Sequence, residues 1–308
     1  MLINEQILNN IHYYIYVFTV YSFIGWSLET PFHSFYAKKF INRGFLYGPF
    51  CPIYGVGCML LVKFLSPLKY NIIILFVTSV VVASTLEYFT GLAMEKLFDS
   101  KWWDYSDNKF NFQGRICLQY SLFWGLGSVF VIKVLHPFVK KMLNMIPLQY
   151  SIYICLIIII YFTIDSIFTL ISVIQLKNYL EQLSQLSSEI KERLGNMTAI
   201  AIDKVGDIKS SAADKASELR SSASHKVGGL KTSATEKVDV IKNSASNKVT
   251  EFEKAVQDLK VKYENLLHKA TSNSARLIKA FPYLTSKKFN QSIKDIKKSI
   301  NKNFKNPR

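Results

Sequence analysis

The sequence lacks the usual signatures of metal, nucleotide and covalent chemistry. Its 308 residues include only 4 cysteines, and none of these forms a CxxC pair or a Cys/His cluster with zinc spacing. No GxxxxGK[ST] segment is present, so no loop of this sequence would cradle ATP phosphates in the Walker manner. No catalytic triad stands out either. We therefore expect a protein that is not an enzyme and that needs no cofactor.

Charge is scarce in the first part of the sequence. Residues 1–176 hold 12 Lys+Arg and 8 Asp+Glu, whereas residues 177–308 hold 26 and 14. The second part contains no tryptophan. This contrast predicts two regions of different character, an apolar one over 1–176 and a polar, basic one over 177–308.

Five apolar segments of the first region are long enough to cross a bilayer. They cover residues 11–28, 44–65, 71–92, 116–135 and 150–176. Pro49 and Pro52 near the start of the second segment indicate a helix start or a broken half-helix. Pro137 follows the fourth segment and is expected to stop it. We therefore predict an all-α polytopic membrane protein with about five transmembrane helices.

Five spans would place the two chain termini on opposite sides of the membrane. The loop with Lys38, Lys39 and Arg43, the loop over 102–115 and the polar tail would then share one side. The positive-inside bias predicts that this side is cytoplasmic and that the N-terminus lies outside. Lys140 and Lys141 would lie outside as well, which counts against the assignment.

Polar residues of the apolar region gather between residues 87 and 124. Glu87 and Glu95 are eight residues apart, which on a helix puts both carboxylates within about a quarter-turn of one face. A polar and aromatic loop follows them. It is either an interfacial hairpin anchored by its aromatic residues, or a constellation that handles a ligand or docks a partner. In the purely structural alternative, Asp104 pairs with Arg115.

Ionisable residues inside predicted spans are costly in a bilayer and are candidates for function. Glu87 and Asp165 are the two that stand out. Asp165 in particular lies deep within the segment over 150–176. A pairing of either acid with a lysine is possible in principle. The sequence alone does not show whether such a pair forms.

The polar region contains an internal repeat of eleven residues, with five copies over 201–255. Alanine opens each copy, and the fourth place is always lysine: Lys204, Lys215, Lys226, Lys237 and Lys248. At about 100° per residue, positions one, five and eight form a narrow apolar stripe with basic residues along both edges. We predict an amphipathic helical rod over 177–270 that lies on a lipid surface. The alternatives are self-association into a right-handed coiled coil or homo-oligomer and a solvated spacer.

Residues 271–308 carry ten basic residues and one acid, Asp295. Such an excess favours an anionic partner. Because the tail is tethered to a membrane, we expect the lipid bilayer rather than nucleic acid.

Five motifs within residues 15–135 carry a resemblance to a known family. They are FIGWSLE, FINRGFLYGPFCPIYGVG, LEYFTGLAMEKLF, KWWDYSDNKFNFQGRICL and SLFWG. In number, order and spacing they resemble the CmpB-like family of ABC-transporter type IV permeases, which are bacterial multi-pass membrane proteins. The repeats have no counterpart in this resemblance. The candidate functional or docking positions that it implies are Glu29, Arg43, Pro49, Pro52, Tyr54, Glu87, Glu95, Trp102, Trp103, Asp104, Tyr105, Asn111, Gly114 and Arg115.

The resemblance implies a permease component in the cell membrane. Since no Walker loop is present, its ATPase would be a separate chain that docks on the loop around Trp102 and Trp103. The alternative function is a membrane-anchored scaffold that acts through the repeat tail. An intramembrane enzyme acting on lipid is a third hypothesis, and no nucleophile–base spacing supports it.

Overall fold

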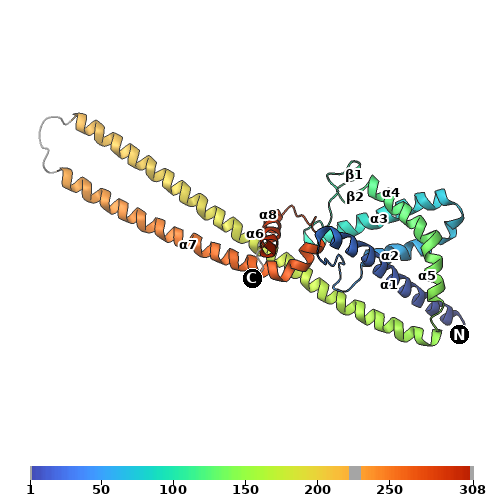
Figure 1. Ribbon diagram of the computed structural model, residues 1–308. Helices are drawn as coiled ribbons and strands as arrows, with labels where there is room; N and C mark the ends of the chain where they lie inside the picture. Colours follow the sequence, from blue (N-terminus) through green and yellow to red (C-terminus); the bar gives the residue numbers. More distant parts are fainter. Residues whose placement is uncertain (1, 222–229, 306–308) are drawn as a thin grey trace. The chain divides into compact units, whose positions relative to one another are not determined.

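The protein is described from a computed structural model that covers residues 2–221 and 230–305. Side chains are described within these ranges except at residues 2–9, 36, 148, 200, 201, 203–249 and 303–305. Most of the described chain is helical and almost none of it is strand, which confirms the expected all-α fold (Figure 1). The helices are α1 (Leu2–Ala37), α2 (Pro52–Leu60), α3 (Ile72–Phe98), α4 (Leu118–Phe130), α5 (His136–Leu143), α6 (Leu148–Ser221), α7 (Leu230–Ala280) and α8 (Asn290–Lys305). A short antiparallel hairpin, β1 (Asn111–Phe112) and β2 (Ile116–Cys117), lies between α3 and α4.

The chain divides into two compact units. One consists of Met1–Leu180 together with Ala270–Arg308, and the other is Glu181–Lys269. We call the first the membrane domain and the second the inserted unit. The long helix α6 leaves the membrane domain, and α7 returns to it. The lysines at the fourth place of each repeat lie outside the described side chains, so their predicted lipid contacts remain a prediction.

Four helical segments of the described chain are long and apolar enough to cross a membrane. They are Pro52–Tyr70, Ile72–Phe98, Leu118–Leu143 and Gln149–Ala199. The first predicted span, over 11–28, lies within α1 but is not among them. Much of its apolar surface comes from tyrosines and Trp26, whose polar tips lower its hydropathy.

The start of the second predicted span is wrong, because residues 44–51 form a loop rather than a helix. Pro49 is the centre of a tight turn in which the Phe50 amide donates to the Gly48 carbonyl at 2.8 Å. The helix α2 begins only at Pro52, where proline costs nothing because a first-turn amide has no helical acceptor. A π-helical turn η1 (Leu61–Leu65) and a 3-10 turn η2 (Ser66–Tyr70) complete this span.

The expected stop at Pro137 is also wrong. After α4, a π-helical turn η3 (Val131–Leu135) leads directly into α5, and Pro137 occupies the first turn of α5. The wider turn accommodates a residue without an amide hydrogen, so the span continues to Leu143.

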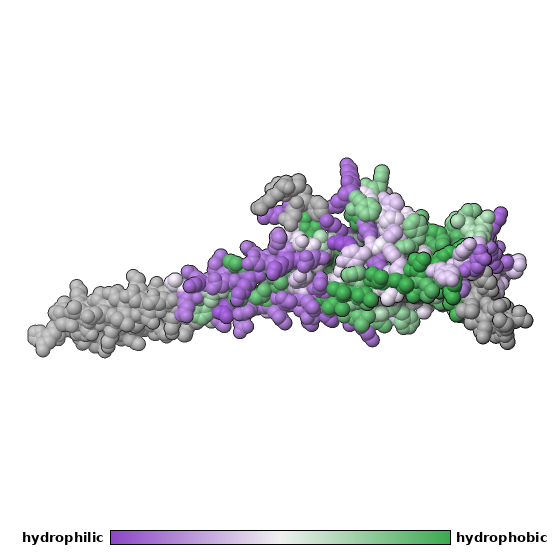
Figure 2. All heavy atoms as spheres, turned by 90° about the horizontal axis from the view of Figure 1, so that it is seen from below, coloured by the Kyte–Doolittle hydropathy of each residue, from purple (hydrophilic) through white to green (hydrophobic). Residues whose placement is uncertain are grey.

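The core of the membrane domain lies where α1, α2 with η1, α3 and η3 with α5 meet. Val17, Tyr21, Leu65 and Leu75 are at most 3% exposed there. The helices α1 and α2 pack closely together, as do α3 and α4. The outer surface is apolar too, and Figure 2 shows hydrophobic residues over much of the membrane domain. Val81, Leu126 and Ile157, from three of the candidate spans, are 60%, 59% and 67% exposed, as expected of a lipid-facing surface.

Candidate functional site

Glu29 of α1 is held by two groups that follow it in the chain. The Tyr54 hydroxyl on α2 donates to Glu29 Oε1 at 2.6 Å, and Arg43 Nε lies 3.4 Å from Oε2. The close approach of α1 and α2 requires a glycine at position 55, because a Cβ there would clash with Ser22 of α1. Glu29 is therefore a paired carboxylate. We call Glu29, Tyr54 and Arg43 together the Glu29 site.

Glu87 of α3 is buried and has no cation beside it among the described side chains. It is 8% exposed, and the Tyr105 hydroxyl donates to its Oε1 at 3.0 Å. Its Oε2 makes no hydrogen bond of ordinary geometry within the described part of the chain. Burial and the neighbouring Glu87 charge raise the pKa of Tyr105, so this phenol stays a donor. We call Glu87 with Tyr105 the Glu87 site.

An aromatic bridge joins the two sites. The Tyr54 ring packs edge-on against the indole of Trp124 in α4, with the ring centroids 5.6 Å apart. Trp124 lies on the helix that follows the Tyr105 loop, and Tyr105 stacks on Tyr120 of the same helix at 4.8 Å. Helices α1, α2, α3 and α4 and the loops that carry Arg43 and Tyr105 thus contribute to one polar and aromatic cluster inside the membrane domain.

Glu95 faces the same loop as Glu87, as their helical spacing predicts. Arg115 Nη2 lies 2.7 Å from Glu95 Oε2, and the guanidinium also lies over the Tyr88 ring at 5.5 Å. The alternative pairing of Asp104 with Arg115 is wrong. Asp104 instead accepts a bond from the Ser106 hydroxyl at 2.5 Å.

The loop between α3 and α4 is held by its own polar residues. Asn111 donates to the Asn108 carbonyl at 2.8 Å and accepts from the Gly114 amide at 3.1 Å. Gly114 has a φ of +69°, and a Cβ there would clash with Asp104 and Ser106. Burial acts to raise the pKa of Asp104, but the Ser106 bonds and the Lys101 charge outweigh it and lower the pKa. These residues shape the loop and present Tyr105 to Glu87.

The two neighbouring tryptophans have different environments. The Trp103 indole donates to the Arg115 carbonyl at 2.9 Å and so closes the loop. Trp102 is only 4% exposed, and it is covered by Phe281 of the tail, with ring centroids 4.7 Å apart. Trp102 is therefore not free for the partner docking that the sequence suggested.

Asp165 is hydrogen-bonded by backbone amides rather than paired with a lysine. Its two oxygens accept from the Tyr47 and Gly48 amides at 2.8 and 2.9 Å. Arg276 binds carbonyl groups of the same loop, and its guanidinium donates to the Leu46 carbonyl at 3.0 Å. Asp165 thus accepts hydrogen bonds from loop amides that have no helical carbonyl as an acceptor. A hollow of about 590 Å³ beside it is lined by Tyr161 and Phe168.

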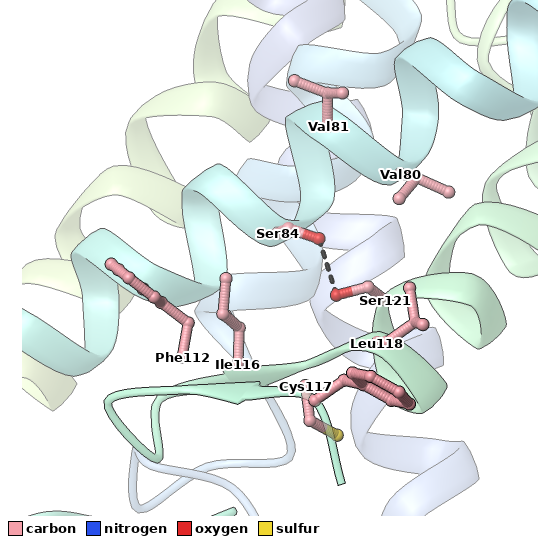
Figure 3. A pocket seen from close by; sticks show the side chains of 9 residues that line it. Val80, Val81, Ser84, Phe112, Ile116, Cys117, Leu118 and Ser121 are labelled. Carbon is pink, nitrogen blue, oxygen red and sulfur yellow. Dashed lines mark hydrogen bonds between the residues drawn. The ribbon is translucent and has the colours of Figure 1, made fainter.

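A mostly apolar groove of about 380 Å³ lies between α3, α4 and the β-hairpin (Figure 3). Ser84 donates to Ser121 at 2.8 Å across it, and the other lining residues are Val80, Val81, Phe110, Phe112, Ile116, Cys117 and Leu118. Phe110 and Phe112 are 81% and 56% exposed. Among the described residues, no group of three or more His, Cys, Asp or Glu side chains could hold a metal ion.

Some participants had no usable sequence signal. Arg276 and Phe281 stand in a basic tail, where charge counting suggests lipid and nothing points to loop carbonyls or to Trp102. Trp124 could have been predicted from the sequence, because it lies in the SLFWG motif. Its position on the helix that follows the loop after Glu87 could have indicated that Trp124 joins the Glu29 site and the Glu87 site.

One comparison with known proteins gives a match. A family described as putative ABC-transporter type IV matches residues 16–170. That range includes Glu29, Arg43, Tyr54, Glu87 and Tyr105 and excludes the repeats and the tail. No curated protein and no solved structure matches the chain. The chain is a membrane protein that belongs to the putative ABC-transporter type IV family.

Proposed function

We propose that this chain is the permease component of a transporter whose ATPase is a separate chain. The observation that carries the proposal is the convergence of family positions on two carboxylates, the half-buried Glu29 and the buried Glu87, joined through Tyr54 and Trp124. Ionisable groups are retained inside membrane helices chiefly where they line a path or bind a solute. Glu29 has its cation, whereas Glu87 has none among the described side chains. Glu87 is therefore the group that would meet a proton or a cationic part of the solute.

The separate ATPase would dock on the exposed part of the α3–α4 loop. Phe110 and Phe112 fit this role because they are exposed aromatic residues at the hairpin, whereas Trp102 is covered. Exposed aromatic side chains are favoured anchors of protein interfaces. The cytoplasmic side is proposed for this loop from the positive-inside bias.

The test is affinity purification of the tagged chain from gently solubilised membranes. We expect a nucleotide-binding ATPase to co-purify and to be lost with Phe110→Asp, which keeps a residue tolerant of the local φ of +52°. Tyr70→Asp is the matched control, because Tyr70 is 85% exposed but precedes the opposite end of α3. Failure to recover any ATPase would contradict the proposal.

A second measurement isolates Glu87. In proteoliposomes, Glu87→Gln should retain the ATPase but lower its ATP hydrolysis, because the amide neither takes up a proton nor carries a charge. Hydrolysis equal to that of the unmodified complex would remove Glu87 from the mechanism while leaving the docking role untouched.

A membrane-anchored scaffold is the second candidate. The observation that favours it is that Glu181–Lys269, which contains the repeats, forms a compact unit of its own. The test places the full chain in neutral liposomes and adds anionic liposomes. Tethering that falls with salt, and that is lost when Lys204, Lys215, Lys226, Lys237 and Lys248 become Gln, would support the scaffold. Absence of tethering would exclude this lipid-binding form of it.

A further inference from the structure

Residues 276–286, which we call the docking segment, lie against two loops of the membrane domain. One loop is 43–46 and the other is 98–102, and together we call them the docking groove. Both loops fall within the residues that the family matches, whereas the docking segment lies far outside them. The segment contacts the groove at three successive anchors.

The first anchor is a charged one. Arg276 donates through Nη1 to the Leu46 carbonyl at 3.0 Å and through Nη2 to the Phe45 carbonyl at 3.3 Å. Its guanidinium also lies 4.0 Å from the centroid of the Tyr47 ring. Burial lowers the pKa of Arg276. The fork of donors suits these carbonyls because the loop lacks helical partners for them.

The second anchor is aromatic. Phe281 meets the Trp102 ring edge-on, and its centroid lies 6.5 Å from that of Phe45. The Arg43 guanidinium lies 5.9 Å from the Phe281 centroid and donates to the Ala280 carbonyl. The Phe281 ring thereby contacts Phe45, Trp102 and Arg43, all of which lie within the family-matched residues.

The third anchor is a backbone pair. The Lys101 amide donates to the Thr285 carbonyl at 2.8 Å, and the Thr285 amide donates back to the Lys101 carbonyl at 3.0 Å. The Ser286 hydroxyl adds a bond of 2.6 Å to the Asp99 carbonyl. A single antiparallel bridge thus pairs Thr285 of the segment with the backbone of Lys101.

We propose that the docking groove is a peptide-binding site and that the docking segment is its resident ligand, supplied by the same chain. Each anchor recognises a chemical feature: an arginine, an aromatic residue five positions later, and a backbone amide and carbonyl four positions after that. None of the three depends on a covalent connection between the docking segment and the docking groove. The groove therefore binds the same segment when it is supplied as a separate molecule, provided that its own copy is displaced.

The first experiment adds the segment in trans. The probe is a fluorescent peptide of residues 274–289, and the receptor is the full chain carrying Phe281→Ala and Thr285→Pro. These changes remove the aromatic anchor and the Thr285 amide donor from the resident segment. We expect the variant to bind the peptide at least about tenfold more tightly than the unmodified chain, in which the groove is occupied. A peptide that itself carries Phe281→Ala should bind weakly.

Equal binding of the peptide to both chains would overturn the proposal, and so would equal binding of both peptides to the variant. Both readouts are independent of transport and of any ATPase. The proposed permease function can therefore fail without affecting them.

A second experiment leaves the three anchors of the resident segment in place except for the cysteine at Thr285. Cysteines at Lys101 and Thr285 should form a disulfide on mild oxidation, because Cα atoms of a hydrogen-bonded antiparallel pair lie about 5.5 Å apart. We expect a monomer with shifted mobility on a non-reducing gel, and no shift for either single variant or for the pair Lys109→Cys with Thr285→Cys. Disulfide-linked dimers would assign the ligand to a second copy, and absence of any bond would remove the segment from the groove. Either result would overturn the proposal.

Discussion

The Glu29 site and the Glu87 site use the same pair of groups in different electrostatic settings. Each has a carboxylate that accepts a tyrosine hydroxyl, from Tyr54 at 2.6 Å and from Tyr105 at 3.0 Å. Only Glu29 has an arginine, Arg43 at 3.4 Å. The comparison separates a carboxylate whose charge is already balanced from one that is available for a proton or a cation.

The largest effect is expected when the balanced site loses its cation. Arg43→Ala leaves Glu29 unpaired and also removes the bond to the Ala280 carbonyl. We expect a loss of about 2–3 kcal/mol in the free energy of unfolding, less than for a fully buried pair because the Glu29 side chain is 30% exposed. Thermal unfolding in detergent measures it.

The control for Arg43 is a double variant. Glu29→Gln combined with Arg43→Ala should regain part of the lost stability, since the uncompensated charge is gone. If the double variant were as unstable as the sum of the two single variants, Arg43 would act through its tail contacts alone.

The next effect concerns the loop that presents Tyr105 to Glu87. Gly114→Ala should cost about 1–3 kcal/mol, because its φ of +69° disfavours a side chain and a Cβ would clash with Asp104. Gly127→Ala is the matched control, because a Cβ there meets nothing within 4 Å. It should be neutral or stabilising in α4. Equal losses in the thermal unfolding of both variants would show that the loop imposes no special conformation.

The direct comparison of the two acids gives a smaller effect. Glu29→Gln should destabilise by about 1–2 kcal/mol because Arg43 loses its partner. Glu87→Gln should change stability by less than about 1 kcal/mol, since no cation is left unpaired. Parallel thermal unfolding curves measure both. A larger loss for Glu87→Gln would mean that Glu87 has a charged partner after all.

Local patterns predicted part of this arrangement. The helical spacing of Glu87 and Glu95 placed both on the face that meets the following loop, because i and i+8 positions depend only on the helix itself. Pro52 likewise marked the first turn of α2. The candidate positions in the α3–α4 loop were indicated as a group by the family resemblance.

Choices between partners could not be predicted in the same way. Arg115 had two acids within reach in the sequence and pairs with Glu95, because Asp104 is satisfied by Ser106 inside the loop. Asp165 pairs with the amides of Tyr47 and Gly48, more than a hundred residues earlier. Charge counting gave the tail a lipid partner, yet it does not reveal that Arg276 fits a particular loop. Each of these outcomes depends on tertiary geometry.

A third ion pair shows how far exposure weakens the balanced arrangement. Asp99, at the end of α3, lies 2.7 Å from Lys177, and the two side chains are 40% and 28% exposed. The Lys177 ammonium lowers the pKa of Asp99. The stabilisation is therefore fully present above the unfolded carboxyl pKa of about 3.9 and is lost as the pH falls through the lower folded value.

The smallest effect is expected at this exposed pair. Asp99→Asn should cost about 0.5 kcal/mol at neutral pH, since solvent screens the pair, and asparagine tolerates the local φ of +52°. As the pH falls below the lowered folded pKa of Asp99, the variant and the unmodified chain should converge, because Asp99 is then protonated in both the folded and the unfolded protein. The measurement is the melting temperature in detergent between pH 3 and pH 7, with roughly 0.5 M salt added in a parallel series to screen the pair. A difference that persists at low pH would assign the loss to the helix end rather than to the charge of Asp99.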